Sequence, residues 1–407
     1  MLRNRSLVGV LAAELVSLTG TSMTFVALPW FVLATTGSAA RMGWVLAAEL
    51  APYGLFGILA GSLVARLGAK RSMLLADAAR GPLMLLVPIL WWTHHLSFPA
   101  LLAATFAIGC FAAIYTPSSR VILPEVLGED ERLVARGSAI LSSGIQLTQI
   151  LGPVLAGVLI AATSPAAVLV IDSGTYFFSF AVIAAVVRAG KRVEQTGAAK
   201  GELAGIRFLI HDPLLGPLLL VACLVNMVAQ GLIVAMQSLV YFHYDANAHV
   251  LGFLFGSFGV GALAGALVAQ QLAQKADLLK LAAFAMLAMP LPLWLLGIAM
   301  PWGAALVVVG VFSFFSPLVN APIIGILTVR TPAALRPKVM SAVMTVALLA
   351  GPLGYLVAGQ AISRLSIYTL FIIIAAALTA GSLAFAFVLL RNRAAADLIA
   401  MPDVAHG

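Results

Sequence analysis

Long apolar stretches recur along this sequence from one end to the other, and they limit what it can fold into. A hydrocarbon core about 30 Å thick needs roughly 20 apolar residues for each helical crossing. With 62% hydrophobic and 9% charged residues, the chain lacks the charged surface that a soluble domain needs. The alternating strands of about ten residues that build a membrane barrel are absent. We therefore predict an all-α membrane protein whose twelve transmembrane helices cover residues 7–34, 42–64, 72–93, 99–121, 137–162, 166–188, 214–239, 250–273, 278–299, 302–327, 339–362 and 366–390.

The positive charges predict how these helices are oriented. Only two of the 23 Lys and Arg residues, Arg41 and Arg364, fall in loops expected on the outer side. This asymmetry follows the positive-inside rule and places both termini in the cytoplasm. The apolar run within Met1–Ala34 is too long for a cleaved signal peptide, so it is expected to remain as the first helix.

The same charge distribution bears on location and partners. The net charge of +8 is expected to report topology and contact with anionic lipid head groups of the cell (inner or plasma) membrane. Nucleic-acid binding would need a clustered basic face with interleaved aromatic residues, and the sequence has none. We therefore expect membrane lipids as partners and no nucleic acid.

The longest polar break divides the chain into six spans plus six. We expect an N-terminal six-helix bundle over residues 1–190, a cytoplasmic linker over 191–213, and a C-terminal six-helix bundle with a cytoplasmic tail over 214–407. Apolar residues at helical spacing within 201–213 predict a short helix lying on the membrane surface.

The two halves also repeat each other weakly, at offsets of 200, 199 and 204 residues. Three matches at nearly constant spacing indicate an internal duplication and predict two pseudo-symmetric bundles. Parallel repeats of six helices with a substrate path between them are typical of transporters. The matched segments are Tyr115–Pro117 with Phe315–Pro317, Gly152-Pro153 with Gly351-Pro352, and Gly61–Ala65 with Gly265–Ala269.

A short basic loop joins the second and third predicted spans. Gly61 is expected to let another helix approach closely, and Gly68 to permit a tight turn. Arg66, Lys70 and Arg71 are expected to hold the loop on the cytoplasmic side and to bind helix C-termini or carboxylates.

The spacing of this loop resembles the signature loop of the major facilitator superfamily, Gly-x-x-x-Asp-Arg-x-Gly-Arg-Arg/Lys. The resemblance implies the major facilitator fold and a conformational switch that uses the loop. Ala65 stands where the family usually has Asp, so the usual charge relay that locks one conformation is incomplete here. Asp77 and Arg80, one helical turn apart just inside the third span, are expected to supply part of a substitute pair.

A proline kink in the fifth span carries a second resemblance. Pro153 removes a helical hydrogen bond and bends the helix, while Gly152 and Ala156 form a face of small residues for tight packing. With Gly157, the pattern resembles the motif of antiporters in this superfamily, although Thr148 and Ala156 replace glycines. The resemblance implies export in preference to uptake.

Further segments resemble one drug-exporter branch of the superfamily, which contains macrolide, tetracycline and multidrug proton antiporters and the enterobactin exporter. The resemblance implies proton-coupled efflux of lipophilic or cationic small molecules by a monomer. Thr21 stands where some close multidrug relatives carry an acid, and Arg136 replaces a usual Asn. The matching segments are Ala27–Trp30 with Thr36–Ser38, Tyr115–Pro117 with Arg120 and Leu123–Glu125, and Leu169 with Asp172.

Four acidic residues lie inside predicted spans, and all are in the first half of the chain. Each costs roughly 2.5–3.5 kcal/mol near the bilayer centre, so its retention indicates a function. We expect the first bundle to bind the proton and the second to shape an amphipathic substrate wall. Glu49, which has apolar neighbours and no local cation, is the first candidate, followed by Asp172 and Glu14. Asp77 is expected to pair with Arg80.

The substrate path is expected to be apolar and aromatic, because such surfaces re-pack around varied ligands. Each of these side chains has a simpler alternative role, which is to face lipid or a neighbouring helix. The candidates are Phe25, Trp30, Tyr53, Tyr176, Asn226 and Gln230.

Other chemistries have little support in the sequence. His243, Asp245 and His249 form too weak a pattern for a metal site, and Cys110 and Cys223 lie inside predicted spans, where a disulfide is not expected. A phosphate-binding loop and a hydrolase nucleophile motif are both absent, so we expect a transporter without a cofactor and not an enzyme. Two alternatives stay open: an exporter of a dedicated metabolite or siderophore, and a non-transporting membrane protein such as a scramblase or sensor.

Overall fold

The computed structural model describes residues 5–127, 131–187, 202–212, 215–272, 278–332 and 335–391, and every regular element in these ranges is a helix. The predicted C-terminal tail and the linker residues 191–201 lie outside the described residues. The first six helices are α1 Arg5–Thr36, α2 Ala39–Leu67, α3 Ala69–Trp92, α4 Phe98–Leu127, α5 Glu131–Ala162 and α6 Pro165–Val186. The others are α7 Glu202–His211, α8 Leu215–His243, α9 Ala248–Leu272, α10 Leu278–Ala288, the 3₁₀ helix η2 Leu291–Gly297, α11 Trp302–Arg330, α12 Arg336–Ile362 and α13 Ile367–Arg391.

These helices confirm the predicted all-α membrane class. Ten stretches of the described chain are long and apolar enough to cross a membrane, and α2 makes an eleventh if its two arms, which meet at 67° beyond Gly57, form one span. The eleventh predicted span, 339–362, falls on α12, where Leu348–Ile362 forms a shorter apolar stretch.

One predicted helix is broken in the structure. The sequence predicts a continuous span over 278–299, but α10 ends at Ala288 and the chain continues as the 3₁₀ helix η2. Pro290 and Pro292 explain the change, because neither has a backbone N–H to donate to an α-helical hydrogen bond. The predicted span is kept, because Lys280–Gly297 is long and apolar enough to cross a membrane, but its second part is a 3₁₀ helix.

The chain forms two compact units. The first comprises Met1–Ala199 together with Gln237–Gly256, and the second comprises Lys200–Met236 and Ser257–Gly407. The division therefore differs from a simple cut at the linker, because the end of α8 and the start of α9 group with the first six helices.

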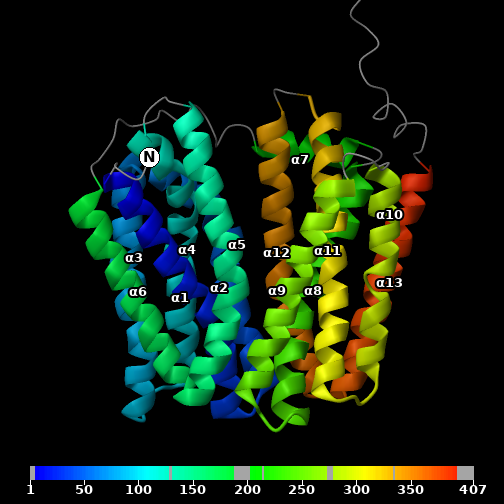
Figure 1. The fold of residues 1–407 in the computed structure, drawn as a ribbon, viewed down its shortest axis with the longest axis horizontal. Helices are drawn as coiled ribbons and strands as arrows, with labels where there is room; N and C mark the ends of the chain where they lie inside the picture. The colour runs from blue at the N-terminus through cyan, green and yellow to red at the C-terminus, as the bar shows by residue number, and fades with distance from the viewer. Residues whose placement is uncertain are drawn as a thin grey trace, which may run out of the picture. The chain divides into compact units, whose positions relative to one another are not determined.

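Helix α1 is the centre of the first unit (Figure 1). It packs against α6, α5 and α2, while α4 packs against α2 and α3. In its most apolar window 61% of the residues are buried, more than in any other spanning helix described. A helix that is apolar all round is expected in the interior of a bundle, and this burial explains why α1 has no polar face.

Two glycines related by the internal repeat differ in their surroundings. A Cβ atom on Gly265 would collide with the backbone of Phe314, so α9 and α11 approach closely there. A Cβ on Gly61 would meet no described atom within 4 Å. The close helix approach expected at Gly61 is thus not present in this structure, whereas it occurs at its repeat partner.

The predicted surface segment contains α7, which packs against α12 in the second unit. Its Leu209 is fully buried in an apolar cluster with Leu215, Val339 and Ala342, whereas Ile210 on another face is exposed. This one-sided burial is the behaviour of an amphipathic helix.

Candidate functional site

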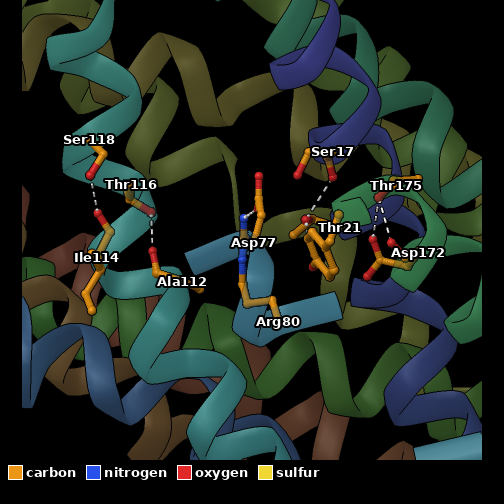
Figure 2. Close-up of polar contacts among 11 residues, drawn as sticks. Ser17, Thr21, Asp77, Arg80, Ala112, Ile114, Thr116, Ser118, Asp172 and Thr175 are labelled. Carbon is orange, nitrogen blue, oxygen red and sulfur yellow. Dashed lines mark hydrogen bonds and ion pairs between the residues drawn. The ribbon is translucent and has the colours of Figure 1, made fainter. Parts of the chain in front are cut away.

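A buried ion pair lies in the interior of the first unit. Arg80 Nη2 donates to Asp77 Oδ1 one helical turn earlier in α3, and the two residues are 3% and 0% exposed. The Arg80 guanidinium also lies over two aromatic rings, with its Cζ 4.1 Å from the ring centroid of Tyr115 and 4.3 Å from that of Tyr176. Figure 2 shows the pair between α4 on one side and α1 with α6 on the other. Besides its salt bridge, the Arg80 guanidinium is therefore packed between aromatic rings from α4 and α6.

This position corrects part of the sequence interpretation. The pairing of Asp77 with Arg80 is confirmed, but the pair was expected to serve the loop between α2 and α3. Asp77 lies nine residues beyond Gly68, which at 1.5 Å per residue is about 13 Å along the helix. Full burial between Tyr115 and Tyr176 places the pair in the bundle interior, where it has no contact with the basic loop in the described residues.

Asp172 of α6 is bound to α1 by one hydrogen bond and to its own helix by another. Its Oδ2 accepts from the Thr24 hydroxyl at 2.6 Å, and its Oδ1 accepts from the Thr175 hydroxyl at 3.1 Å. Gly20 makes this contact possible, because a Cβ there would collide with Asp172 Oδ1 and with the Thr175 hydroxyl. The carboxyl is fully buried, and both of its oxygens have partners.

Glu14 of α1 is as deeply buried as Asp172, but one of its carboxyl oxygens lacks a hydrogen-bond partner among the described residues. It is 1% exposed, and the charges that act on it are those of Arg80 and Asp77. The Tyr115 and Ser119 hydroxyls lie near the carboxyl, yet Glu14 Oε1 has no hydrogen-bond partner in the described part of the chain. Glu14 therefore faces the ion pair without joining it.

Glu49 of α2 is half-buried and lies near the same interior. Its charge acts on Tyr53 and on Tyr176, and the charge of Asp172 acts on it. Its backbone carbonyl packs against Gly109 of α4, where a Cβ would collide with it. All three acids predicted to bind protons therefore border one interior, together with Asp77.

The charges in this interior do not balance. The charge of Arg80 acts on Glu14, Asp77 and Asp172, and the described spans contain one ion pair among these groups, Asp77 with Arg80. Glu14, Glu49 and Asp172 have no such partner, and an unpaired ionised carboxylate inside a low-dielectric region is strongly unfavourable. Protonation of these carboxyl groups, or a cation close to them, would offset this charge.

The loop between α2 and α3 contains a glycine with positive φ and is held in place by three hydrogen bonds. Gly68 has φ +84°, a backbone conformation that favours glycine. The Lys70 ammonium donates to the carbonyls of Val187 and Ala184 at the C-terminal end of α6, where the helix dipole favours a cation. The Ala69 N–H donates to Glu125 at the end of α4.

The other basic residues of this loop, Arg66 and Arg71, are exposed. Ala65, which replaces the family's usual Asp, is exposed as well. The loop is therefore held to its own bundle through Lys70, while Arg66 and Arg71 point their charges outward.

Small residues let α1 and α9 approach the kinked helix α5. A Cβ on Gly152 would collide with Ser22 of α1, and one on Gly157 would collide with the backbone of Gly252 in the part of α9 that belongs to the first unit. Pro153 lies between these contacts, within α5. The antiporter-type motif thus serves close packing on two sides of the helix.

The predicted path residues fall into different environments. Phe25 and Trp30 make edge-to-face contacts with Phe255 and Tyr241, at centroid distances of 6.1 and 5.7 Å. In the second unit Asn226 is half-buried, and Gln230 accepts a hydrogen bond of 2.9 Å from the Tyr355 hydroxyl.

Tyr176 is 2% exposed, its hydroxyl lies 3.1 Å from that of Thr21, and its ring packs on the Arg80 guanidinium. Sequence reasoning did not assign roles to Tyr115, Ser179, Thr24 or Thr175. Only Thr175 had a local signal, because it lies three residues after Asp172. The described residues also contain no group of three or more His, Cys, Asp or Glu placed to hold a metal, so His243, Asp245 and His249 do not form such a group.

Comparison with known sequences gives a family and several relatives. The family model of the Major Facilitator Superfamily matches residues 10–321, more than half of the chain. The multidrug efflux pump Tap of Mycolicibacterium fortuitum is 26% identical over 380 residues, which cover 89% of this chain and 90% of that protein. Tap of Mycobacterium tuberculosis is 26% identical over 382 residues, or 90% of this chain and 89% of that protein.

Solved structures show the same fold. The nucleoside transporter NupG matches with a TM-score of 0.77 and 11% identity, covering 94% of this chain and 98% of that one. A bacterial homolog of the human lysosomal transporter Spinster, in an inward-facing and unoccupied conformation, matches with a TM-score of 0.69 and 14% identity, covering 97% and 95%. At these identities the likeness extends to the fold alone.

Proposed function

Because this chain belongs to the Major Facilitator Superfamily, we propose that it is a secondary transporter that exports lipophilic, cationic small molecules in exchange for protons. The observation that carries the proposal is that three carboxyl groups of the first unit, those of Glu14, Glu49 and Asp172, have no ion-pair partner among the described residues, whereas Arg80 is already paired with Asp77. Protons neutralise the unpaired carboxyls in one state, and a cationic substrate offsets their charge in the other. Because proton and substrate stabilise different charge states, each shifts the conformational equilibrium.

The direction of transport is supported by two observations. The relatives that match most of the chain are multidrug efflux pumps. The tightly packed glycines and the proline of α5 follow the antiporter-type pattern. In this proposal the protein lies in the cell membrane with both termini in the cytoplasm, as a monomer, and the basic loop with Lys70 lies at the cytoplasmic rim.

Accumulation of a fluorescent lipophilic cation in cells that lack their own efflux pumps tests this function. Cells that express the wild-type protein are expected to retain less dye, and an uncoupler should abolish the difference because it collapses the proton gradient. Glu14→Gln, Glu49→Gln and Asp172→Asn should each weaken efflux. Allosteric coupling free energies correspond to effects of about 5- to 150-fold, and losses in that range are expected.

The alternatives predict other results in the same assay. A dedicated metabolite exporter would leave dye retention unchanged, and a scramblase or sensor would show no effect of the uncoupler. If the three substitutions together leave uncoupler-sensitive efflux at the wild-type level, the carboxyl groups do not carry the protons. Variants with Gln or Asn keep the side-chain volume, so equal expression checked by immunoblot separates a transport defect from a folding defect.

A further inference from the structure

Five buried polar atoms in α1, α3, α4 and α6 have no hydrogen-bond partner among the described residues. They come from four different helices and are five of the nine such side-chain atoms found in the described part of the chain. A buried polar group without a partner is rare in a stable fold, and an internal water molecule is the usual explanation. The atoms are Glu14 Oε1 of α1, Asp77 Oδ2 and Arg80 Nε of α3, Tyr115 OH of α4 and Ser179 Oγ of α6.

These atoms form one cluster. The Tyr115 ring packs on the Arg80 guanidinium at 4.1 Å, and Asp77 is bonded to Arg80. The Ser179 hydroxyl lies next to Asp77 and to the Tyr115 hydroxyl. Glu14 faces the pair, since Arg80 and Asp77 are the charges that act on it. All five residues are between 0% and 5% exposed, so bulk solvent does not supply the missing partners.

We propose that Glu14, Asp77, Arg80, Tyr115 and Ser179 enclose an internal hydrated proton-binding site, in which water bridges the Glu14 carboxyl to the Asp77–Arg80 pair and Glu14 takes the proton. The inference rests on the proposed function and names where the coupled proton is held. A water molecule needs two to four polar partners, and the cluster offers donors and acceptors of both kinds. The Arg80 Nε–H and the two hydroxyls donate, and the two carboxylate oxygens accept.

Within the cluster Glu14 is the proton acceptor, because its Oε1 has no hydrogen-bond partner among the described residues. Asp77 has Arg80, and both oxygens of Asp172 accept hydrogen bonds from threonines. A hydronium ion in the bridge transfers its proton to a Glu14 oxygen, leaving a neutral carboxyl and a water molecule. The cluster then changes from one net negative charge to zero, and Arg80 is left with Asp77 as its only ionised partner in the cluster.

The groups around Arg80 define how this change is transmitted. Asp77 comes from its own helix, Tyr53 from α2, Tyr115 from α4, Tyr176 and Asp172 from α6, and Glu14 from α1. When Glu14 is ionised it competes with Asp77 for the guanidinium, and when it is protonated it does not. Protonation therefore changes the electrostatic attraction that α1 exerts on α3.

Infrared difference spectra of the purified protein in lipid, recorded between alkaline and acidic pH, test the assignment. The wild-type protein is expected to show the C=O stretch of a protonated carboxyl that shifts in heavy water. Glu14→Gln should remove this component, Glu14→Asp should move it, and Tyr115→Phe should shift its frequency because the bridging water loses a donor. Asp172→Asn is the matched control, since the Glu14 component should persist in it.

Persistence of the component in Glu14→Gln, or its loss in Asp172→Asn, would overturn the assignment. The spectra do not depend on transport, so the component can be present even if dye efflux shows no proton coupling. In that case the proton site stands and the proposed export function fails. Thermal unfolding of each variant, followed by size-exclusion chromatography, shows which variants are misfolded. If Glu14→Gln is one of them, the spectrum of Glu14→Asp tests the assignment instead.

Hydroxyl-radical footprinting tests the hydration directly. Radicals formed at internal water label adjacent side chains even when bulk solvent does not reach them. Tyr115 is expected to be labelled although it is 5% exposed, whereas Phe371, which is fully buried in the second unit, should not be. Equal absence of label at both residues contradicts a hydrated site.

Discussion

Replacement of Arg80 by methionine is expected to destabilise the protein by about 3–5 kcal/mol, because it leaves the Asp77 carboxylate buried without a partner. The substitution also removes the cation that packs on Tyr115 and Tyr176. The loss of stability is measured by heating the protein in detergent and recording the fraction that remains monodisperse at each temperature. Little purified Arg80→Met protein should remain folded at a temperature that the wild type survives.

The double variant Asp77→Leu/Arg80→Met separates folding from function. Buried ion pairs are often replaced by apolar residues of similar volume without loss of stability, so the double variant should regain most of the stability that Arg80→Met loses. It should nevertheless fail to export dye, since Glu14 has lost the pair that it faces. Wild-type efflux by a folded double variant would mean that the ion pair has only a structural role.

Replacement of Gly20 by alanine is expected to disrupt the contact between α1 and α6. The added Cβ would collide with Asp172 Oδ1 and with the Thr175 hydroxyl, so the hydrogen bond of 2.6 Å from Thr24 to Asp172 cannot be kept in place. Overpacking of this kind costs typically about 1–3 kcal/mol, to which the weakened hydrogen bond adds. A lower unfolding temperature and reduced efflux are both expected.

Gly174 provides the matched control in α6. A Cβ added there meets no described atom within 4 Å, so Gly174→Ala should leave the unfolding temperature and efflux close to those of the wild type. Both substitutions exchange glycine for alanine inside a helix and have the same effect on the unfolded chain. Equal behaviour of Gly20→Ala and Gly174→Ala would show that the α1–α6 contact adapts without cost.

The sequence allowed the fold to be predicted because the thickness of the hydrocarbon layer sets the length of each apolar run. The pairing of Asp77 with Arg80 could also be predicted from the sequence, because residues three apart lie on one face of a helix. The exception is the span over 278–299, where Pro290 and Pro292 turn the end of the helix into a 3₁₀ segment. The prediction counted the apolar residues of this segment and gave too little weight to its prolines.

The site could be predicted only in part, because its partners come from helices far apart in the sequence. Asp172 was expected to carry a proton, but its bond to Thr24 links residues 148 positions apart. The packing of Tyr115 and Tyr176 on Arg80 likewise depends on how α4 and α6 lie against α3. No local spacing encodes such contacts, so the depth of the ion pair and the cluster around Glu14 required the structure.

Uphill transport in proteoliposomes tests the central claim most directly. Purified protein is reconstituted with an imposed pH gradient as the sole driving force, and accumulation of the lipophilic cation tetraphenylphosphonium is measured with an ion-selective electrode. Proton-coupled export predicts accumulation on the acidic side above equilibrium, which collapses with the gradient and is lost in the Glu14→Gln/Glu49→Gln/Asp172→Asn triple variant. Equilibration of the cation at the same rate with and without the gradient would contradict it.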